Sequence, residues 1–118
     1  MSGLAQVTAQ DQDGHRVVRV SGEVDLSNVA AVTAAIARAL PGDAPAVVLD
    51  LTPTTYLDSA GIAMLFRLAE RLGHRRQELR LVVPLDAPVR AILELTRVEA
   101  VMRVAESIDE LEGPAPAS

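Results

Sequence analysis

The sequence predicts an α/β fold with a largely parallel or mixed sheet, and three observations support this. Strand patterns alternate with helical patterns in the order β-β-α-β-α-β-α-β-α. The runs "AVVLDL" and "LRLVVP" are continuously apolar, as in strands buried on both faces. The 118 residues, 49% of them hydrophobic, suit one globular unit. We therefore expect a single domain over residues 1–112 and a disordered tail over residues 113–118.

The N-terminal half is expected to form a hairpin, a helix and a buried strand. The segments "LAQVTAQ" and "HRVVRVSG" flank the turn signal "DQDG", which predicts a β-hairpin. In "LSNVAAVTAAIARAL" the apolar side chains recur on one helical face, at Val29, Val32, Ile36 and Leu40. Ser27 or Asn28 is suited to cap this helix, and "PG" at residues 41–42 should end it. "APAVVLDL" then predicts a strand.

The C-terminal half repeats the alternation. "IAMLFRLAERL" carries an apolar helical stripe that should end at Gly73, and "ELRLVVP" predicts another buried strand. Asp86 is suited to cap a third helix, "APVRAILELT", with Pro88 in its first turn. "AVMRVA" predicts a last strand, and Ser107 with Glu110 predicts a capping box for a short fourth helix.

Composition excludes several classes of function. A net charge of -5 and only two aromatic residues argue against nucleic-acid binding. The absence of cysteine, and two histidines without ligand spacing, argue against a metal site. No phosphate-binding glycine motif predicts a cofactor. No apolar run reaches the roughly 20 residues of a membrane span, and the first residues lack a signal-peptide pattern. We expect a cytoplasmic protein without cofactor or metal.

The stretch "YLDSAG", residues 56–61, lies between a strand and a helix and permits three interpretations of Ser59. Either Asp58 or Ser59 should cap the helix that follows. A nucleophile elbow would need glycine at position 57, where this chain has Leu57, and its base would have to be His15 or His74. We therefore do not expect an enzyme.

The third interpretation is a phosphorylation switch. A phosphate on a serine at a helix N-terminus meets free backbone N–H groups and the positive end of the helix dipole. Gly61 would let a partner approach the backbone closely, and Asp58 would add negative charge. Apolar contacts would come from Leu57, Ile62 and Ala63.

Three segments resemble the STAS domains, in particular the anti-sigma factor antagonists of bacteria. They are "SGEVDLSN", "VVLDLTPTTYLDSAGIAML" and "LRLVVPLDAPVRAILELTRVEAVMRVAESIDEL", and the resemblance covers about residues 4 to 112. It implies a STAS-like fold, with a small mixed, mostly parallel sheet and about four helices packed mainly on one face.

The resemblance also implies a function. Ser59 would be the phosphoacceptor of an ATP-using anti-sigma factor serine kinase, and a PP2C-type phosphatase would restore it. The unphosphorylated form would bind the kinase and so free a sigma factor. Asp25 matches the acidic residue that lies near this serine in the family. The expected partner-binding residues are Asp25, Leu57, Asp58, Ser59, Ala60, Gly61, Ile62 and Ala63.

The chain departs from the family pattern at two positions, and alternatives stay open. Arg97 stands where many relatives carry glycine, and Ala60 where relatives often carry a hydroxyl. Thr54 and Thr55 are nearby hydroxyls that fit turn chemistry. A STAS-type regulatory subunit of a membrane lipid ABC transporter, or a nucleotide sensor near Asp25 and Ser59, would show the same motif. The oligomeric state, monomer or weak dimer, is also left open.

Overall fold

A computed structural model describes residues 5–12, 15–40, 42 and 44–111. The described elements in chain order are β1 Gln6–Gln12, β2 His15–Val24, α1 Val29–Ala39, β3 Ala46–Asp50, β4 Thr54–Leu57, α2 Ser59–His74, β5 Glu78–Val82, α3 Arg90–Leu95, the 3-10 turn η1 Val98–Ala100, β6 Arg103–Ala105 and the 3-10 turn η2 Ile108–Leu111. The expected β-hairpin, the first two helices and the buried strands are confirmed. The tail at residues 113–118 and the turn at residues 13–14 lie outside the described residues.

The sheet is mixed and mostly parallel, as predicted. Its strand order is β1-β2-β3-β5-β6, and β4 pairs with β2 beside this path. Only the β1–β2 hairpin is antiparallel, and the other four pairings are parallel. The register shifts between Gly22 and Glu23, where β2 pairs with β4. Gly22 has φ 89, a backbone conformation that a side chain would strain, so glycine permits this irregularity.

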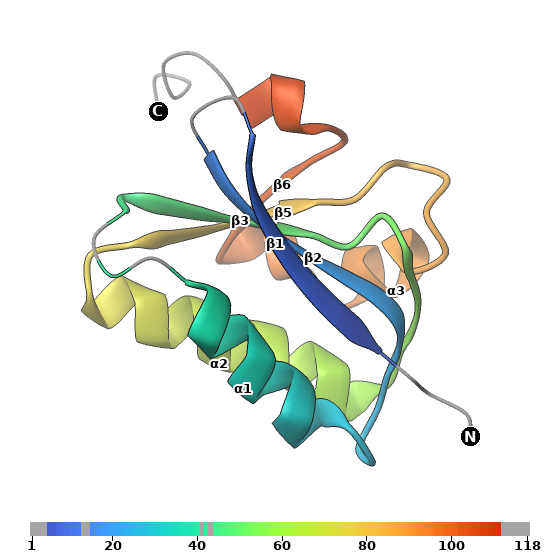
Figure 1. Ribbon diagram of the computed structural model, residues 1–118. Coiled ribbons are helices and arrows are strands. Elements are labelled where there is room, and N and C mark those ends of the chain that lie inside the picture. The colour runs from blue at the N-terminus through green and yellow to red at the C-terminus, as the bar shows by residue number, and fades with distance from the viewer. Residues whose placement is uncertain (1–4, 13–14, 41, 43, 112–118) are drawn as a thin grey trace.

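The helices cover mainly one face of the sheet, which confirms the expectation. Figure 1 shows α1 and α2 side by side beneath the strands, with α3 on the side of the molecule where α2 begins. The main core lies between these layers and includes the fully buried Leu49, Leu65 and Leu81. The opposite face carries a smaller apolar cluster, closed by η2 through Ile108 and Leu111. The start of α2 therefore lies at one end of the helical layer.

Three expectations about the elements were wrong. The structure has three α-helices among its described residues, because the fourth is the 3-10 turn η2. The carboxylate of Glu110 accepts a hydrogen bond from the backbone N–H of Glu106, not from Ser107 as a capping box would require. Strand β4 was missed, because "TPTTYL" contains turn-forming residues and its pairing with β2 is long-range.

The expected caps of α1 and α3 were also wrong. Helix α3 begins at Arg90, beyond Asp86 and Pro88, and has no side-chain cap. Asn28 precedes α1 without capping it, since its amide oxygen accepts from the backbone of Asp25 instead. Arg97 has φ 56, a left-handed conformation that glycine adopts without the steric cost a side chain brings.

A candidate partner-binding surface around Ser59

Asp58 caps α2, and Ser59 is the first residue of the helix. Asp58 has an extended backbone, and its Oδ1 accepts a hydrogen bond from the backbone N–H of Gly61 at 3.0 Å. This is the geometry of an N-cap. The hydroxyl of Ser59 is not used as the cap, and its side chain is exposed. Of the two residues that the sequence allowed as cap, Asp58 has that role.

Asp58 also ties the loop before α1 to the start of α2. Its Oδ2 accepts a hydrogen bond from the backbone N–H of Leu26 at 3.0 Å, and its own N–H donates to Val24 O at 3.3 Å. The N–H of Gly61, and then that of Leu26, hold the pKa of Asp58 below its ordinary value of 3.8, although desolvation partly opposes them. The carboxylate form is therefore the one that organises this corner.

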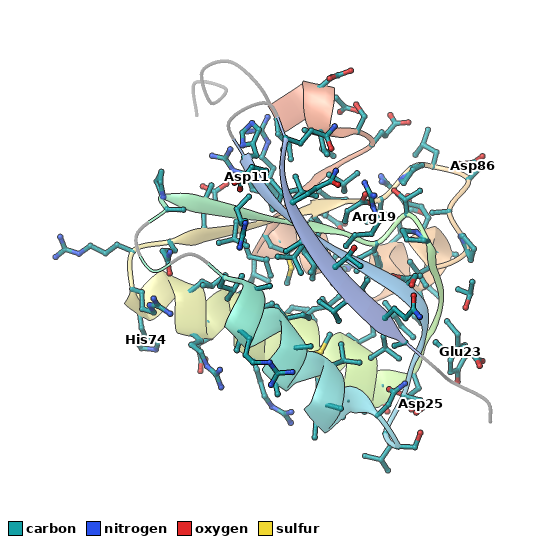
Figure 2. All side chains as sticks on the ribbon, viewed as in Figure 1. Asp11, Arg19, Glu23, Asp25, His74 and Asp86 are labelled. Atoms are coloured by element: carbon teal, nitrogen blue, oxygen red, sulfur yellow. The ribbon has the colours of Figure 1, made fainter. Side chains whose placement is uncertain are left out.

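The loop of residues 25–28 is stabilised by its own polar side chains. Asp25 accepts hydrogen bonds from the N–H of Ser27 at 2.9 Å and from its hydroxyl at 2.5 Å. The amide of Asn28 accepts from the N–H of Asp25 at 2.9 Å and donates to Glu23 O at 2.8 Å. Figure 2 shows Asp25 and Glu23 at the same end of the molecule. Because these bonds fix the loop, Leu26 is held in a defined position beside Asp58.

The predicted partner-binding residues divide into exposed and buried groups. Ser59 is exposed, while Asp25, Asp58, Ala60 and Ala63 are half-buried, and Leu57, Gly61 and Ile62 are buried. A Cβ on Gly61 would lie 2.9 Å from Cδ2 of Leu57 and 3.1 Å from Val24 O. Gly61 thus lets α2 approach the sheet closely, which is a packing role that the sequence analysis did not assign to it.

Two large apolar side chains beside Ser59 were not predicted. Leu26 is 78% exposed on the loop that Asp58 holds, and Tyr56 is 49% exposed at the end of β4. The sequence does not indicate that either side chain lies here. Tyr56 is positioned by strand β4, which was not predicted, and Leu26 by the hydrogen bond from its backbone N–H to Asp58.

A surface hollow adjoins Ser59. Its volume is about 440 Å³, and its lining residues come from β4, α2 and α3: Tyr56, Leu57, Asp58, Ser59, Ile62, Ile92 and Thr96. The participation of α3 was also missed, since 33 residues separate Ser59 from Ile92 in the sequence. The hollow is largely apolar, with the exposed residues Tyr56 and Ser59 in its lining, which suits the docking of a protein partner.

The described residues do not assemble a hydrolytic or metal centre around Ser59. His74 ends the 16-residue helix that Ser59 begins, about 22 Å away along its axis. His15 begins β2, whereas the other end of that strand lies beside Asp58. Within the described ranges no three metal-ligating side chains cluster. There is also no helix, in the part of the chain that was searched, with the length and hydropathy to cross a bilayer.

The fold is a small α/β domain with an exposed serine at the start of α2, and comparison with known proteins gives its family. The family model for the STAS domain matches residues 6–111. The chain belongs to the STAS domain family.

Relatives within this family include anti-sigma factor antagonists. The chain is 34% identical over 67 residues to the anti-sigma-F factor antagonist RsfB of Mycobacterium tuberculosis. That match covers 57% of this chain and 55% of RsfB, so it spans about half the length of the relative.

Solved structures resemble the whole described fold. The crystal structure of an anti-sigma factor antagonist from Mycobacterium paratuberculosis has a TM-score of 0.78 at 28% identity, over 93% of this chain and 94% of that one. The anti-sigma factor antagonist SpoIIAA in its unphosphorylated form has a TM-score of 0.66 at 17% identity, over 94% and 100% of the two chains. The second of these likenesses concerns the fold alone.

Proposed function

We propose that this chain is an anti-sigma factor antagonist, a binding module switched by phosphorylation of Ser59. The observation that carries the proposal is the division of roles at the start of α2. Asp58 provides the helix cap, so the exposed hydroxyl of Ser59 is free to be modified without loss of that cap. The named relatives in Mycobacterium tuberculosis and Mycobacterium paratuberculosis support the same role.

The proposed partner is an anti-sigma factor that is also an ATP-using serine kinase. The unphosphorylated chain binds it and thereby frees a sigma factor. The phosphorylated chain is released, and a PP2C-type phosphatase restores it. In this proposal the protein is not an enzyme, acts in the cytoplasm, and uses residues 1–112 as one domain. The contact surface is the predicted set around Ser59, extended by the exposed Leu26 and Tyr56.

Electrostatics explains how one phosphate would release the partner. A phosphate adds about -1.5 to -2 charges at neutral pH. Asp58 is adjacent in the chain, and the loop it holds contains Asp25, so the corner is already acidic. Burying a further, unpaired anion against a partner is costly. A tenfold preference for the unmodified form needs only about 1.4 kcal/mol.

The test is a pull-down from the native cytoplasm with wild type, Ser59→Ala and Ser59→Asp as baits. We expect wild type and Ser59→Ala to retain an anti-sigma factor kinase, and Ser59→Asp to lose it. Ser107→Asp is the matched control, because Ser107 is an exposed serine next to η2, on the other side of the sheet. It adds the same charge and should retain the partner.

Two results would contradict the proposal. Retention of the same partner by all four baits would remove the switch, and retention of a transporter ATPase would favour the transporter subunit instead. A second assay incubates the purified partner kinase with ATP and the chain. We expect phosphate to be incorporated at Ser59 in wild type and not to be incorporated in the Ser59→Ala variant.

A further inference from the structure

A second hollow lies between α1 and α2, away from the surface around Ser59. The two helices pack side by side on the same face of the sheet (Figure 1). The groove between them has a volume of about 430 Å³. Its floor is apolar and is formed by the buried side chains of Ile36, Met64 and Leu68. Water in this groove therefore contacts hydrocarbon.

The wall from α1 has small alanine side chains at its exposed positions. Ala30, Ala34 and Ala37 line the groove and are exposed, and the only charged residue within the helix is Arg38. A surface helix usually carries charged or polar side chains on its outer face. Short side chains here leave the groove open, where longer ones would fill it.

The wall from α2 is basic. Arg67 and Arg71 line the groove one helical turn apart, and both are exposed. Four ion pairs occur among the described residues, and none of them includes either arginine. In a chain with a net charge of -5, two neighbouring arginines without carboxylate partners are suited to an external anion.

We propose that this groove binds an amphiphile with a single apolar chain and an anionic head group, such as a fatty carboxylate. The apolar chain would lie on the floor of Ile36, Met64 and Leu68, against the alanine wall. The anionic head would pair with both Arg67 and Arg71 at the rim. The volume falls within the range of about 300–1,000 Å³ that is typical of small-ligand pockets. The limited volume of the groove and its basic rim favour a small amphiphile over a partner helix.

The proposed site is independent of the Ser59 switch. Helix α2 turns Met64, Arg67 and Leu68 toward α1, whereas Ile62 lines the hollow that α3 shares with Ser59. A binding test on the purified chain needs neither a kinase nor a sigma factor. Its failure would leave the proposed function untouched, and failure of the pull-down would not affect this site.

The experiment titrates the purified full chain with decanoate, decanol and decyltrimethylammonium, all below their micelle-forming concentrations, and follows backbone amide shifts by NMR. We expect decanoate to bind with saturation and to shift amides of residues 29–37 and 64–71. Decanol should bind more weakly, and decyltrimethylammonium more weakly still. Equal affinities for all three probes, no saturable binding of decanoate, or shifts elsewhere would overturn the proposal.

Variants test the contributions of the two arginines on α2 and of the alanine side chains on α1 separately. The double variant Arg67→Ala, Arg71→Ala should weaken decanoate about tenfold, because two exposed ion pairs are lost, while decanol stays within about twofold. Ala34→Leu should weaken both probes by filling the groove, and its circular dichroism melt checks that it folds. Arg38→Ala removes an exposed arginine outside the groove lining and should change neither affinity. An unchanged decanoate affinity in the double variant would also overturn the proposal.

Discussion

Asp58 and Ser59 are neighbours in the chain, but their side chains have different environments. The carboxylate of Asp58 accepts hydrogen bonds from Gly61 and Leu26, while the hydroxyl of Ser59 faces solvent. We predict that Ser59→Ala and Ser59→Asp each change the free energy of unfolding by less than about 0.5 kcal/mol, as exposed substitutions do. Asp58→Ala should destabilise the fold more than either, because it removes the cap. Urea denaturation measures all three, and a large loss in Ser59→Ala alone would contradict the assignment of the cap.

The lowered pKa of Asp58 predicts a dependence of stability on pH. Because the folded pKa lies below the ordinary value of 3.8, ionised Asp58 stabilises the fold above that value. This contribution is lost as the pH falls through the folded pKa. The melting temperature of wild type relative to Asp58→Asn should thus be constant from pH 7 to about pH 5 and should decrease below about pH 4. Thermal melts across this range test it. If the melting-temperature advantage of wild type over Asp58→Asn increased as the pH fell, the predicted role of ionised Asp58 would be wrong.

Gly61 and Gly73 lie in the same helix and should respond oppositely to alanine. At Gly61 the added Cβ meets Leu57 and the carbonyl of Val24, so Gly61→Ala should destabilise by about 1–2 kcal/mol despite better helix propensity. At Gly73 no atom lies within 4 Å of the added Cβ, so Gly73→Ala should stabilise by about 0.5–1 kcal/mol. Urea denaturation compares the two. Similar effects at both positions would show that crowding at Gly61 is unimportant.

At the scale of elements, the connection from α3 to η1 contains a strained residue. Arg97 adopts φ 56, which costs a non-glycine residue about 1–2 kcal/mol. Glycine relieves this strain but increases the conformational entropy of the unfolded chain, which offsets part of the gain. The net effect of Arg97→Gly should be a stabilisation of about 0.5–1 kcal/mol. Ala91→Gly, at an exposed position within α3, is the control and should destabilise by a similar amount. Thermal unfolding distinguishes them, and destabilisation by both would argue against strain at Arg97.

The sequence predicted the elements with strong periodicity and missed those that depend on distant partners. The apolar runs around Val48 and Leu81 and the stripe of α2 identified their strands and helix correctly. Strand β4 forms only because β2 offers it a parallel partner, which local propensity cannot reveal. The expected cap at Asn28 was wrong because its side chain bonds to a different backbone group, and the one at Asp86 was wrong because α3 begins later, at Arg90.

The candidate site was predicted in part for the same reason. The motif placed Asp58 and Ser59 at the start of a helix, and the structure has them there. The loop residue Leu26 and the α3 residue Ile92 reach the same surface through tertiary packing alone. Sequence reasoning thus placed the segment around Ser59 correctly at the start of the helix, but it did not reveal the residues that other segments bring to this surface.

At the scale of the whole molecule, the sheet separates two apolar clusters of unequal size. The smaller one contains Leu111, which is 1% exposed and lies on the face opposite the helices. Leu111→Ala should destabilise by about 2–3 kcal/mol, near the low end for buried leucine because its cluster among the described residues is small. Partner binding at Ser59 should be unchanged at temperatures where the variant is folded. Chemical denaturation and the pull-down test these outcomes, and lost binding by a folded variant would mean that the two faces are coupled.

The separate positions of the cap and the exposed hydroxyl have a consequence for how long a modification lasts. The hydrogen bonds that define the start of α2 do not use the Ser59 hydroxyl, so a covalent modification there breaks none of them. Both forms of the chain would keep the same fold, and a serine phosphate ester is lost only by hydrolysis, which is extremely slow without a catalyst. Each molecule would then keep a record of its last encounter with a modifying enzyme. The lifetime of the phosphorylated state would be set by the kinase and the phosphatase, and not by the stability of the protein that carries the phosphate.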